Sequence, residues 1–373
     1  MTRNVPLSVL DLAPVSAGSD VATALRNTVD LAQHVEGWGY SRYWVAEHHF
    51  VAVASASPAV LIGQIAAATN TIHVGAAAVQ LGFTTAPAVV ESFGMLEAFY
   101  PGRIDLGVGR SGQKRAEAQQ QAPTDPATAE VPWREVDGVV VPPPFDVSAL
   151  MRSERNRATS GLLQQPGSVA PDFADQLADI LAMVNGTYTV SGFDVHAVPG
   201  EGSGLTPWIF GSSKGQSAQV AGELGLPFVA SYHITPATAL DAIDAYRNAF
   251  RPSAALAEPY LVVSADVLAA DDSATAAQLA SSYGHWVYSI RAGGGASPYP
   301  DPATSAPLTE EQQALVVDRT KTQFVGNADE VVDGLETLQR ATGADELVIT
   351  SVAFDHRDRL RSHELIAKRW GLS

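Results

Sequence analysis

Short apolar runs alternate along this chain with longer segments in which apolar residues recur at three- and four-residue spacing. The first long segment predicts a helix, because Asp20 can cap its start and one face is apolar: Val21, Leu25, Val29, Ala32 and Val35. The apolar run that follows it, within RYWVAEHHF at 42–50, stops abruptly at Glu47, His48 and His49. A strand is expected to end there and to present polar groups.

The same alternation predicts the fold. Strands are predicted at 7–12, 43–46, 72–81, 103–108, 207–210, 226–230, 260–265 and 346–350, and helices between or after them at 21–35, 59–69, 88–99, 173–184, 216–224, 237–250, 272–290, 309–324, 328–342 and 356–370. Near-continuously apolar strands separated by helices are typical of a parallel sheet covered on its outer face. We therefore expect an α/β protein with a (β/α)8 TIM barrel. A doubly wound open sheet is the alternative, because the pattern does not show closure.

Two segments interrupt this regularity. Residues 113–170, rich in Gln, Ala, Pro and Asp, are expected to form an irregular insertion after strand four, with partial helix at about 147–163. Residues 291–307, rich in Gly and Pro, predict a loop-rich excursion after strand seven, and 187–198 alternate like a hairpin. We expect residues 1–373 to form a single barrel domain that carries these additions.

The composition narrows the possible functions. A net charge of −17 over 373 residues argues against nucleic acid or an anionic membrane surface as partner. The absence of cysteine excludes disulfides, thiolate nucleophiles and Cys-ligated metal centres. No apolar run reaches the roughly 18 residues of a membrane span and the N-terminus lacks a signal core, so we expect a soluble, cytoplasmic protein.

Candidate chemistry follows the strand ends. In a barrel of this kind, the adjacent imidazoles of His48 and His49 would lie at the catalytic end. The sequence GSSKGQSA at 211–218 opens a helix and could hold a phosphate, with Arg110 after strand four as a clamp, although a plain βα loop is equally consistent with it. Adjacent histidines do not converge on one metal ion, and neither HExxH nor GxSxG occurs. Histidine or an organic cofactor must therefore carry the chemistry.

These motifs together resemble one family. RYWVAEHHF, VGAAAVQL, PGRIDLGVGR, FGSS followed by ELGLPF, GHW, FVGNADEV and TGADEL, in this order and spacing, are similar to the luciferase-like flavin monooxygenases, and most similar to the single-chain relatives of the bacterial luciferase alpha subunit. The resemblance covers nearly the whole chain except about 113–170. It implies a barrel, reduced FMN, molecular oxygen and a homodimer. Because no GxGxxG follows a strand, a separate flavin reductase is expected to supply the reduced FMN.

The resemblance also assigns roles to residues of this chain. His48 matches the catalytic histidine and His49 its neighbour in the pocket. Cofactor binding is implied for Ala77 and Ala78 beneath the flavin at a non-prolyl cis peptide, for Arg110, Ser212 and Ser213 at its phosphate, and for Ser231 and Tyr232 beside its ring. Two stretches depart from the family's pattern: LGFT at 81–84 stands where relatives have Leu-Pro-Asn-His, and RSGQK at 110–114 where they have Arg-Ala-Pro-Gly-Thr-Asp.

The function implied is transfer of one oxygen atom from O2 to a small organic substrate through a C4a-peroxyflavin. Exclusion of water would be the protein's main task. Residues 291–307 resemble the family's mobile active-site loop, with a plain connector as the alternative. Two other functions stay open: a deazaflavin (F420)-dependent oxidoreductase that transfers hydride, and a flavin-binding protein without turnover.

Overall fold

The strands close into a barrel. The computed structural model describes residues 5–120 and 131–372, and in it β5 pairs in parallel with β10 and so joins the two ends of the sheet. The order around the barrel is β10, β11, β12, β14, β1, β2, β3 and β5. The predicted TIM barrel is confirmed, and the open doubly wound sheet is wrong. The barrel strands are β1 (Leu7–Asp11), β2 (Arg42–Val45), β3 (His73–Ala76), β5 (Ile104–Gly109), β10 (Pro207–Gly211), β11 (Phe228–Ala230), β12 (Leu261–Ala270) and β14 (Glu346–Thr350).

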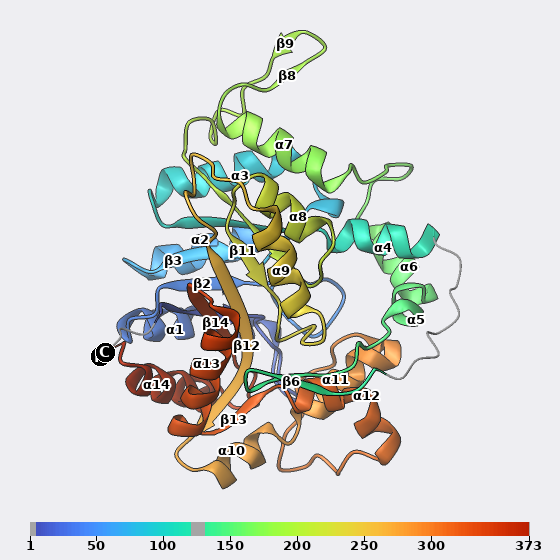
Figure 1. The fold of residues 1–373 in the computed structure, drawn as a ribbon, viewed down its shortest axis with the longest axis vertical. Coiled ribbons are helices and arrows are strands. Elements are labelled where there is room, and N and C mark those ends of the chain that lie inside the picture. Colours follow the sequence, from blue (N-terminus) through green and yellow to red (C-terminus); the bar gives the residue numbers. More distant parts are fainter. Residues whose placement is uncertain (1–4, 121–130, 373) are drawn as a thin grey trace.

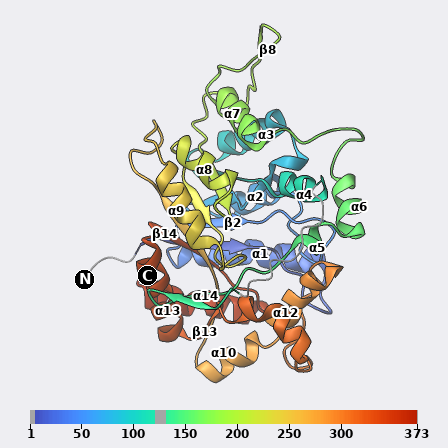
Figure 2. The ribbon, with the colours of Figure 1, turned by 45° about the vertical axis from the view of Figure 1, so that its right-hand side comes forward.

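Helices cover the outside of the barrel (Figure 1). Asp20 accepts a hydrogen bond from the Thr23 amide at 2.7 Å, so the first helix begins where its capping residue predicts. Seen after a turn of 45°, the helices still surround the strands (Figure 2). The covering helices are α1 (Val21–Gly37), α2 (Pro58–Ala68), α3 (Ala86–Phe99), α7 (Phe173–Val184), α8 (Gln216–Glu223), α9 (Ala239–Ala249), α13 (Ala328–Thr342) and α14 (His356–Trp370).

Inside the barrel, large aromatic side chains pack closely against strands at positions occupied by glycine. The rings of Trp44 and Trp208 pack edge to face with centroids 5.5 Å apart. A Cβ on Gly75 would lie 2.5 Å from the Trp44 ring, and a Cβ on Gly107 would lie 1.8 Å from the Ala76 carbonyl oxygen. Glycine is therefore required at both positions by close approach.

A polar layer closes the N-terminal end of the barrel. Arg42 pairs with Asp105 at 2.5 Å and with Glu346 at 3.3 Å, and its guanidinium lies 4.5 Å from the Trp208 ring centroid. Burial raises the pKa of Glu346, against the opposing effects of Arg42 and the hydroxyls of Ser8 and Tyr260. Charges at this end of a barrel serve stability, whereas chemistry belongs to the opposite rim.

Three predicted elements differ from the structure. The third strand is interrupted by a cis peptide between Ala77 and Ala78, after which β4 (Val79–Gln80) and a short 3-10 helix, η1 (Leu81–Phe83), continue the chain. The helix predicted at 272–290 is two helices, α10 (Ser273–Ala280) and α11 (Tyr283–Ser289), followed by a π-helix, η2 (Ile290–Gly294). The helix predicted at 309–324 ends early as α12 (Glu310–Thr320), because Phe324 begins β13 (Phe324–Asn327), which pairs with the end of β12.

The insertion after β5 is more regular than its composition predicts. It begins with helix α4 (Ser111–Gln120), and after 121–130, which lie outside the described residues, a hairpin forms from β6 (Arg134–Val136) and β7 (Val139–Val141). Two short helices, α5 (Ser148–Met151) and α6 (Glu154–Leu162), match the partial helix predicted at 147–163. The predicted hairpin at 187–198 is also present, as β8 (Thr189–Val190) and β9 (Phe193–Asp194), and projects beyond α7 (Figure 1).

A buried histidine on α14 makes stability depend on pH. Both ring nitrogens of His363 are buried without a hydrogen-bond partner among the described residues, and burial lowers the pKa of His363 to about 3. The unfolded chain, with an ordinary pKa near 6.5, binds this proton more readily, so stability is lost as pH falls below about 6.5. When the pH is lowered from 7 to 5, wild type should therefore lose about 2 kcal/mol of unfolding free energy that His363→Leu does not lose.

Urea unfolding of both proteins at the two pH values measures this difference. His34→Leu is the control, because the His34 side chain is 45% exposed. Two results would contradict the assignment of this pH dependence to His363. One is an equal relative gain in unfolding free energy by His34→Leu, and the other is no relative gain by His363→Leu.

Candidate active site

His48 and His49 follow β2 and line one cavity. The His48 amide donates to the Ser55 carbonyl at 2.9 Å, and His49 Nε2 lies 2.9 Å from Glu47 Oε1. The other carboxylate oxygen of Glu47 accepts from the Gln80 amide at 3.0 Å. The segment after β2 is therefore tied to β4, and both imidazoles face a cavity of about 300 Å³.

The cavity is enclosed by segments far apart in sequence. One wall comes from Leu12 and from Val51 and Val53, which follow the histidines. The second comes from α5 and α6 of the insertion, including Leu150 and Met151. Trp286 of α11 and residues 290–296 provide the third. The mixture of an apolar surface with two imidazoles suits a small organic molecule.

A second group of predicted residues lies after β5 and β10. Lys114 Nζ donates to Ser212 Oγ at 3.0 Å, which joins α4 to the loop before α8. Arg110 pairs with Glu117 and stays only 12% exposed. The loop is fixed from behind, since the hydroxyls of Thr235 and Thr238 donate to the Ser212 carbonyl at 3.0 and 2.5 Å. Ser213 is the next residue of the same loop.

The charges of this group favour an anion. Burial lowers the pKa of Lys114, and the positive charge of Arg110 lowers it further, while Glu117 opposes both. Arg110 Nε is buried and has no hydrogen-bond partner among the described residues. Two neighbouring cations with an unused donor are a suitable site for a phosphate, which would relieve their repulsion. Lys114 entered the sequence prediction only as part of a departure from the family pattern, yet it contributes directly to this group.

Ala77 and Ala78 lie on the chain shortly before Gln80, which lines the cavity, and Ala78 adjoins Gly109, which precedes Arg110. The predicted cis peptide joins them at the end of β3. A Cβ on Gly109 would lie 3.4 Å from the Ala78 Cβ, so the second alanine is adjacent to the residue before Arg110. The small side chains leave the backbone at this rim accessible to a flat ring.

Ser231 and Tyr232, both after β11, differ in their surroundings. Thr235 donates to the Ser231 carbonyl at 3.2 Å and to Ser212 as well, so Ser231 lies near the cationic group. Tyr232 instead donates through its hydroxyl to the Val140 carbonyl at 2.8 Å and lines a second cavity of about 270 Å³ beside β7 and β13. The structure therefore does not bring the Tyr232 hydroxyl into the cavity of the two imidazoles.

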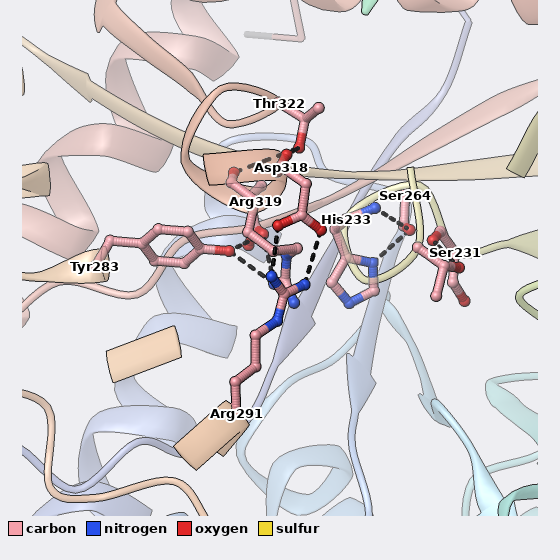
Figure 3. Close-up of polar contacts among 10 residues, drawn as sticks. Ser231, His233, Ser264, Tyr283, Arg291, Asp318, Arg319 and Thr322 are labelled. Atoms are coloured by element: carbon pink, nitrogen blue, oxygen red, sulfur yellow. Dashed lines mark hydrogen bonds and ion pairs between the residues drawn. The ribbon is translucent and has the colours of Figure 1, made fainter. Parts of the chain in front are cut away.

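His233, which sequence reasoning missed, is hydrogen-bonded to Ser264 beside a separate group of polar side chains (Figure 3). Its Nδ1 lies 2.5 Å from Ser264 Oγ. Burial lowers the pKa of His233 to about 4. The charges of Arg319 and His48 also lower this pKa, whereas the charge of Asp266 raises it. Asp266 accepts from Tyr283 and, at 3.0 Å, from Arg319. Burial therefore favours the neutral form of the His233 imidazole, which lies close enough to His48 for their charges to interact. Its position after strand six, beside two predicted residues, was the signal that could have identified it.

The segment after α11 is anchored at both ends. Arg291 binds Asp318 with two nitrogens at 2.5 and 2.8 Å and lies 3.8 Å from the Phe145 ring centroid (Figure 3). At the other end the fully buried Tyr299 donates its amide to the Val15 carbonyl at 2.8 Å. Between them Ala296 accepts from the Ala52 amide at 2.8 Å. The segment forms a wall of the cavity, and its movement as a lid stays a prediction.

Two features are absent from residues 5–120 and 131–372. No group of three or more His, Cys, Asp or Glu side chains is placed to hold a metal ion. No helix in those ranges is long and apolar enough to cross a membrane.

Known proteins resemble this chain over most of its length. A model described as luciferase-like monooxygenase matches residues 5–137 and 168–346. The uncharacterized protein YvbT of Bacillus subtilis (strain 168) is 38% identical over 370 residues, covering 99% of this chain and 97% of that protein. A luciferase-like monooxygenase of Escherichia coli (strain K12) is 34% identical over 365 residues, covering 97% and 96%. The crystal structure of apo-MsnO8 superposes with a TM-score of 0.76 at 30% identity, covering 100% and 99%.

More distant structures share the fold alone. The oxygenating constituent of 3,6-diketocamphane monooxygenase of Pseudomonas putida, in complex with FMN, has a TM-score of 0.62 at 17% identity, covering 98% of this chain and 97% of that one. An F420-dependent secondary alcohol dehydrogenase, in complex with an F420-acetone adduct, has a TM-score of 0.57 at 15% identity, covering 98% of this chain and 99% of that one. One barrel architecture therefore accommodates either cofactor.

Proposed function

The chain belongs to the luciferase-like monooxygenase family, and on that basis we propose that it is a reduced-FMN-dependent monooxygenase that inserts one atom of O2 into a small organic substrate. The observation that carries the proposal is the arrangement of the rim. A cationic group that suits a phosphate follows Gly109, which adjoins Ala78, and the cavity lined by His48 and His49 includes Gln80, two residues after Ala78. Cofactor and substrate can thus bind side by side.

The residues present fit a flavin mononucleotide. Lys114, Arg110 and Ser212 offer two charges and a hydroxyl to its phosphate, and Arg110 Nε has no other partner among the described residues. Ala77 and Ala78 would lie beneath its ring. When bound, reduced flavin supplies electrons for oxygen activation.

Side chains of the protein would transfer protons, and the cavity walls would exclude water. His48 is half-buried at the cavity wall, where an imidazole can donate or accept a proton at the substrate. Burial favours the neutral form of His233, so this imidazole adds no positive charge near His48. The anchored segment 290–299 and helices α5 and α6 shield the site from solvent, as an oxygenase requires to avoid wasted turnover.

Two partners belong to the proposal. A separate flavin reductase would supply reduced FMN. A second copy of the chain would cover α2 and α3, whose outward surface carries large apolar side chains: Val60 is 68% exposed, Met95 54% and Phe99 72%. Exposed apolar residues gathered on neighbouring helices are typical of an interface.

Isotope labelling tests the function. The protein, reduced FMN regenerated by an added flavin reductase, and ¹⁸O2 are incubated with a panel of small organic compounds, and products are analysed by mass spectrometry. We expect one ¹⁸O atom in an organic product. Label found only in hydrogen peroxide would contradict oxygenation, and hydride transfer from reduced F420 with no oxygenated product would favour the dehydrogenase alternative.

The cationic group should recognise the phosphate specifically. Lys114→Met removes one charge-assisted hydrogen bond, so FMN affinity should fall by roughly 10- to 150-fold while riboflavin affinity stays unchanged. Fluorescence titration of both ligands measures the effect. Lys321→Met, which removes a cation 5.0 Å from the Trp133 ring centroid, is the control and should leave FMN affinity unchanged. Equal losses for FMN and riboflavin would place the phosphate elsewhere.

His48→Ala should separate catalysis from cofactor binding. Removal of a positioned acid or base typically costs 100-fold or more in rate. We expect oxygenation to fall by about that factor with FMN affinity nearly intact, as measured by product formation and by titration. His196→Ala, on the exposed segment after β9, is the control. Wild-type turnover in His48→Ala would show that this imidazole has no part in the reaction.

A further inference from the structure

Two imidazoles come from opposite sides of the barrel rim. His233 follows β11 and His48 follows β2, and these strands are separated by β12, β14 and β1 in one direction and by β10, β5 and β3 in the other. The two rings are nevertheless close enough for their charges to interact. Both side chains therefore extend inward from opposite sides of the barrel mouth.

Ser264 fixes the orientation and the tautomer of the His233 ring. Ser264 is 1% exposed, its Oγ lies 2.5 Å from His233 Nδ1 (Figure 3), and its hydroxyl donates to the Ala230 carbonyl at 3.2 Å. A hydroxyl has a single hydrogen, so both contacts are hydrogen bonds only when Nδ1 carries the proton and Ser264 accepts from it. A neutral ring in this tautomer has a lone pair and no hydrogen on Nε2.

The Nε2 atom is available to a ligand. His233 is half-buried, and its Nε2 has no hydrogen-bond partner among the described residues but keeps accessible surface. The nearby carboxylate of Asp266 does not hold the ring, because it accepts from Tyr283 and Arg319 instead. Burial lowers the pKa of His233 to about 4, so the lone pair is present at neutral pH. The rim thus holds a fixed hydrogen-bond acceptor across from His48.

We propose that His233 Nε2 accepts a hydrogen bond from N5–H of reduced FMN and so makes the site selective for the reduced cofactor. The proposal rests on FMN being the cofactor, as proposed above. Oxidised flavin has a lone pair at N5, which would face the lone pair of Nε2, whereas reduction adds a hydrogen at N5. Reduced flavin ionises at N1, the other nitrogen that changes, and an acceptor would repel that negative charge. Ser264 would be the positioning residue, because it keeps Nε2 without a hydrogen.

The affinities for the two redox states of FMN measure this selectivity. Oxidised FMN, and reduced FMN under anaerobic conditions, are titrated by quenching of protein fluorescence, and the ratio of the two dissociation constants is compared between variants. His233→Phe keeps a ring without the acceptor, so the preference for reduced FMN should fall by roughly three- to tenfold, the value of one neutral hydrogen bond. His73→Phe makes the same change at the opposite end of the barrel, where this side chain is 41% exposed, and should keep the wild-type ratio.

An analogue and a second variant isolate the hydrogen bond. 5-Deaza-FMN has carbon in place of N5, so His233→Phe should not change its ratio of dissociation constants. Ser264→Ala keeps the imidazole but removes the partner of Nδ1, so it should lower the preference for reduced FMN as His233→Phe does. Nitrogen NMR of histidine-labelled protein reports the tautomer, and His233→Phe identifies the signals by their loss. In wild type Nδ1 should carry the hydrogen and Nε2 none, and Ser264→Ala should lose this pattern.

The outcomes separate this inference from the proposed function. An unchanged ratio in His233→Phe, an equal fall with 5-deaza-FMN, or a hydrogen on Nε2 in the flavin-free protein would overturn the inference alone. Failure of FMN to bind in either redox state would overturn both. A lowered ratio in His233→Phe without ¹⁸O incorporation by wild type would refute oxygenation and leave the hydrogen bond standing. Thermal midpoints of the variants show that each is folded.

Discussion

Closure of the barrel between β5 and β10 is the constraint on which the rest of the structure depends. The two strands pair in parallel with Trp208 opposite Gly107. A Cβ on Gly107 would lie 2.7 Å from the Phe210 ring of β10 and 1.8 Å from the Ala76 carbonyl oxygen of β3, so glycine is needed for both neighbouring strands to approach β5. With the sheet closed, the C-terminal ends of all its strands form one rim, so His48, Arg110, Ser212 and His233 come from distant parts of the sequence to one end of the molecule.

The sequence predicted best those elements whose hydrophobic period is strong. Strands such as β10 and β11 are continuous apolar runs, and His48 and Arg110 were found because each follows a mainly apolar run. Helix α4 has the sequence SGQKRAEAQQ, without an apolar stripe, so its helical state and the contact of Lys114 with Ser212 were not predictable from periodicity. Strand β13 was missed because Phe324–Asn327 is short and is stabilised by pairing with the far end of β12. Arg155 lay in the insertion, where only the fold shows which side chains face the cavity.

Two surfaces of the rim differ in polarity and charge. The side formed by α4 and the loop before α8 is cationic and polar, and the side formed by α5, α6 and residues 290–296 is mainly apolar with one exposed arginine. Elements of the barrel supply the imidazoles and the alanines between these surfaces. Because α5 and α6 of the insertion provide much of the apolar wall, changes in them can alter the shape of the cavity without disturbing the strands of the barrel.

A crystal structure of the complex with FMN tests the central claim, that cofactor and substrate occupy separate surfaces of one rim. The account predicts the phosphate within hydrogen-bond distance of Lys114, Arg110 and Ser212, and the ring beside Ala77 and Ala78. It also predicts that the cavity lined by Arg155 and Trp286 remains open beside His48. A flavin ring that fills that cavity, or a phosphate bound away from Lys114, would contradict the account.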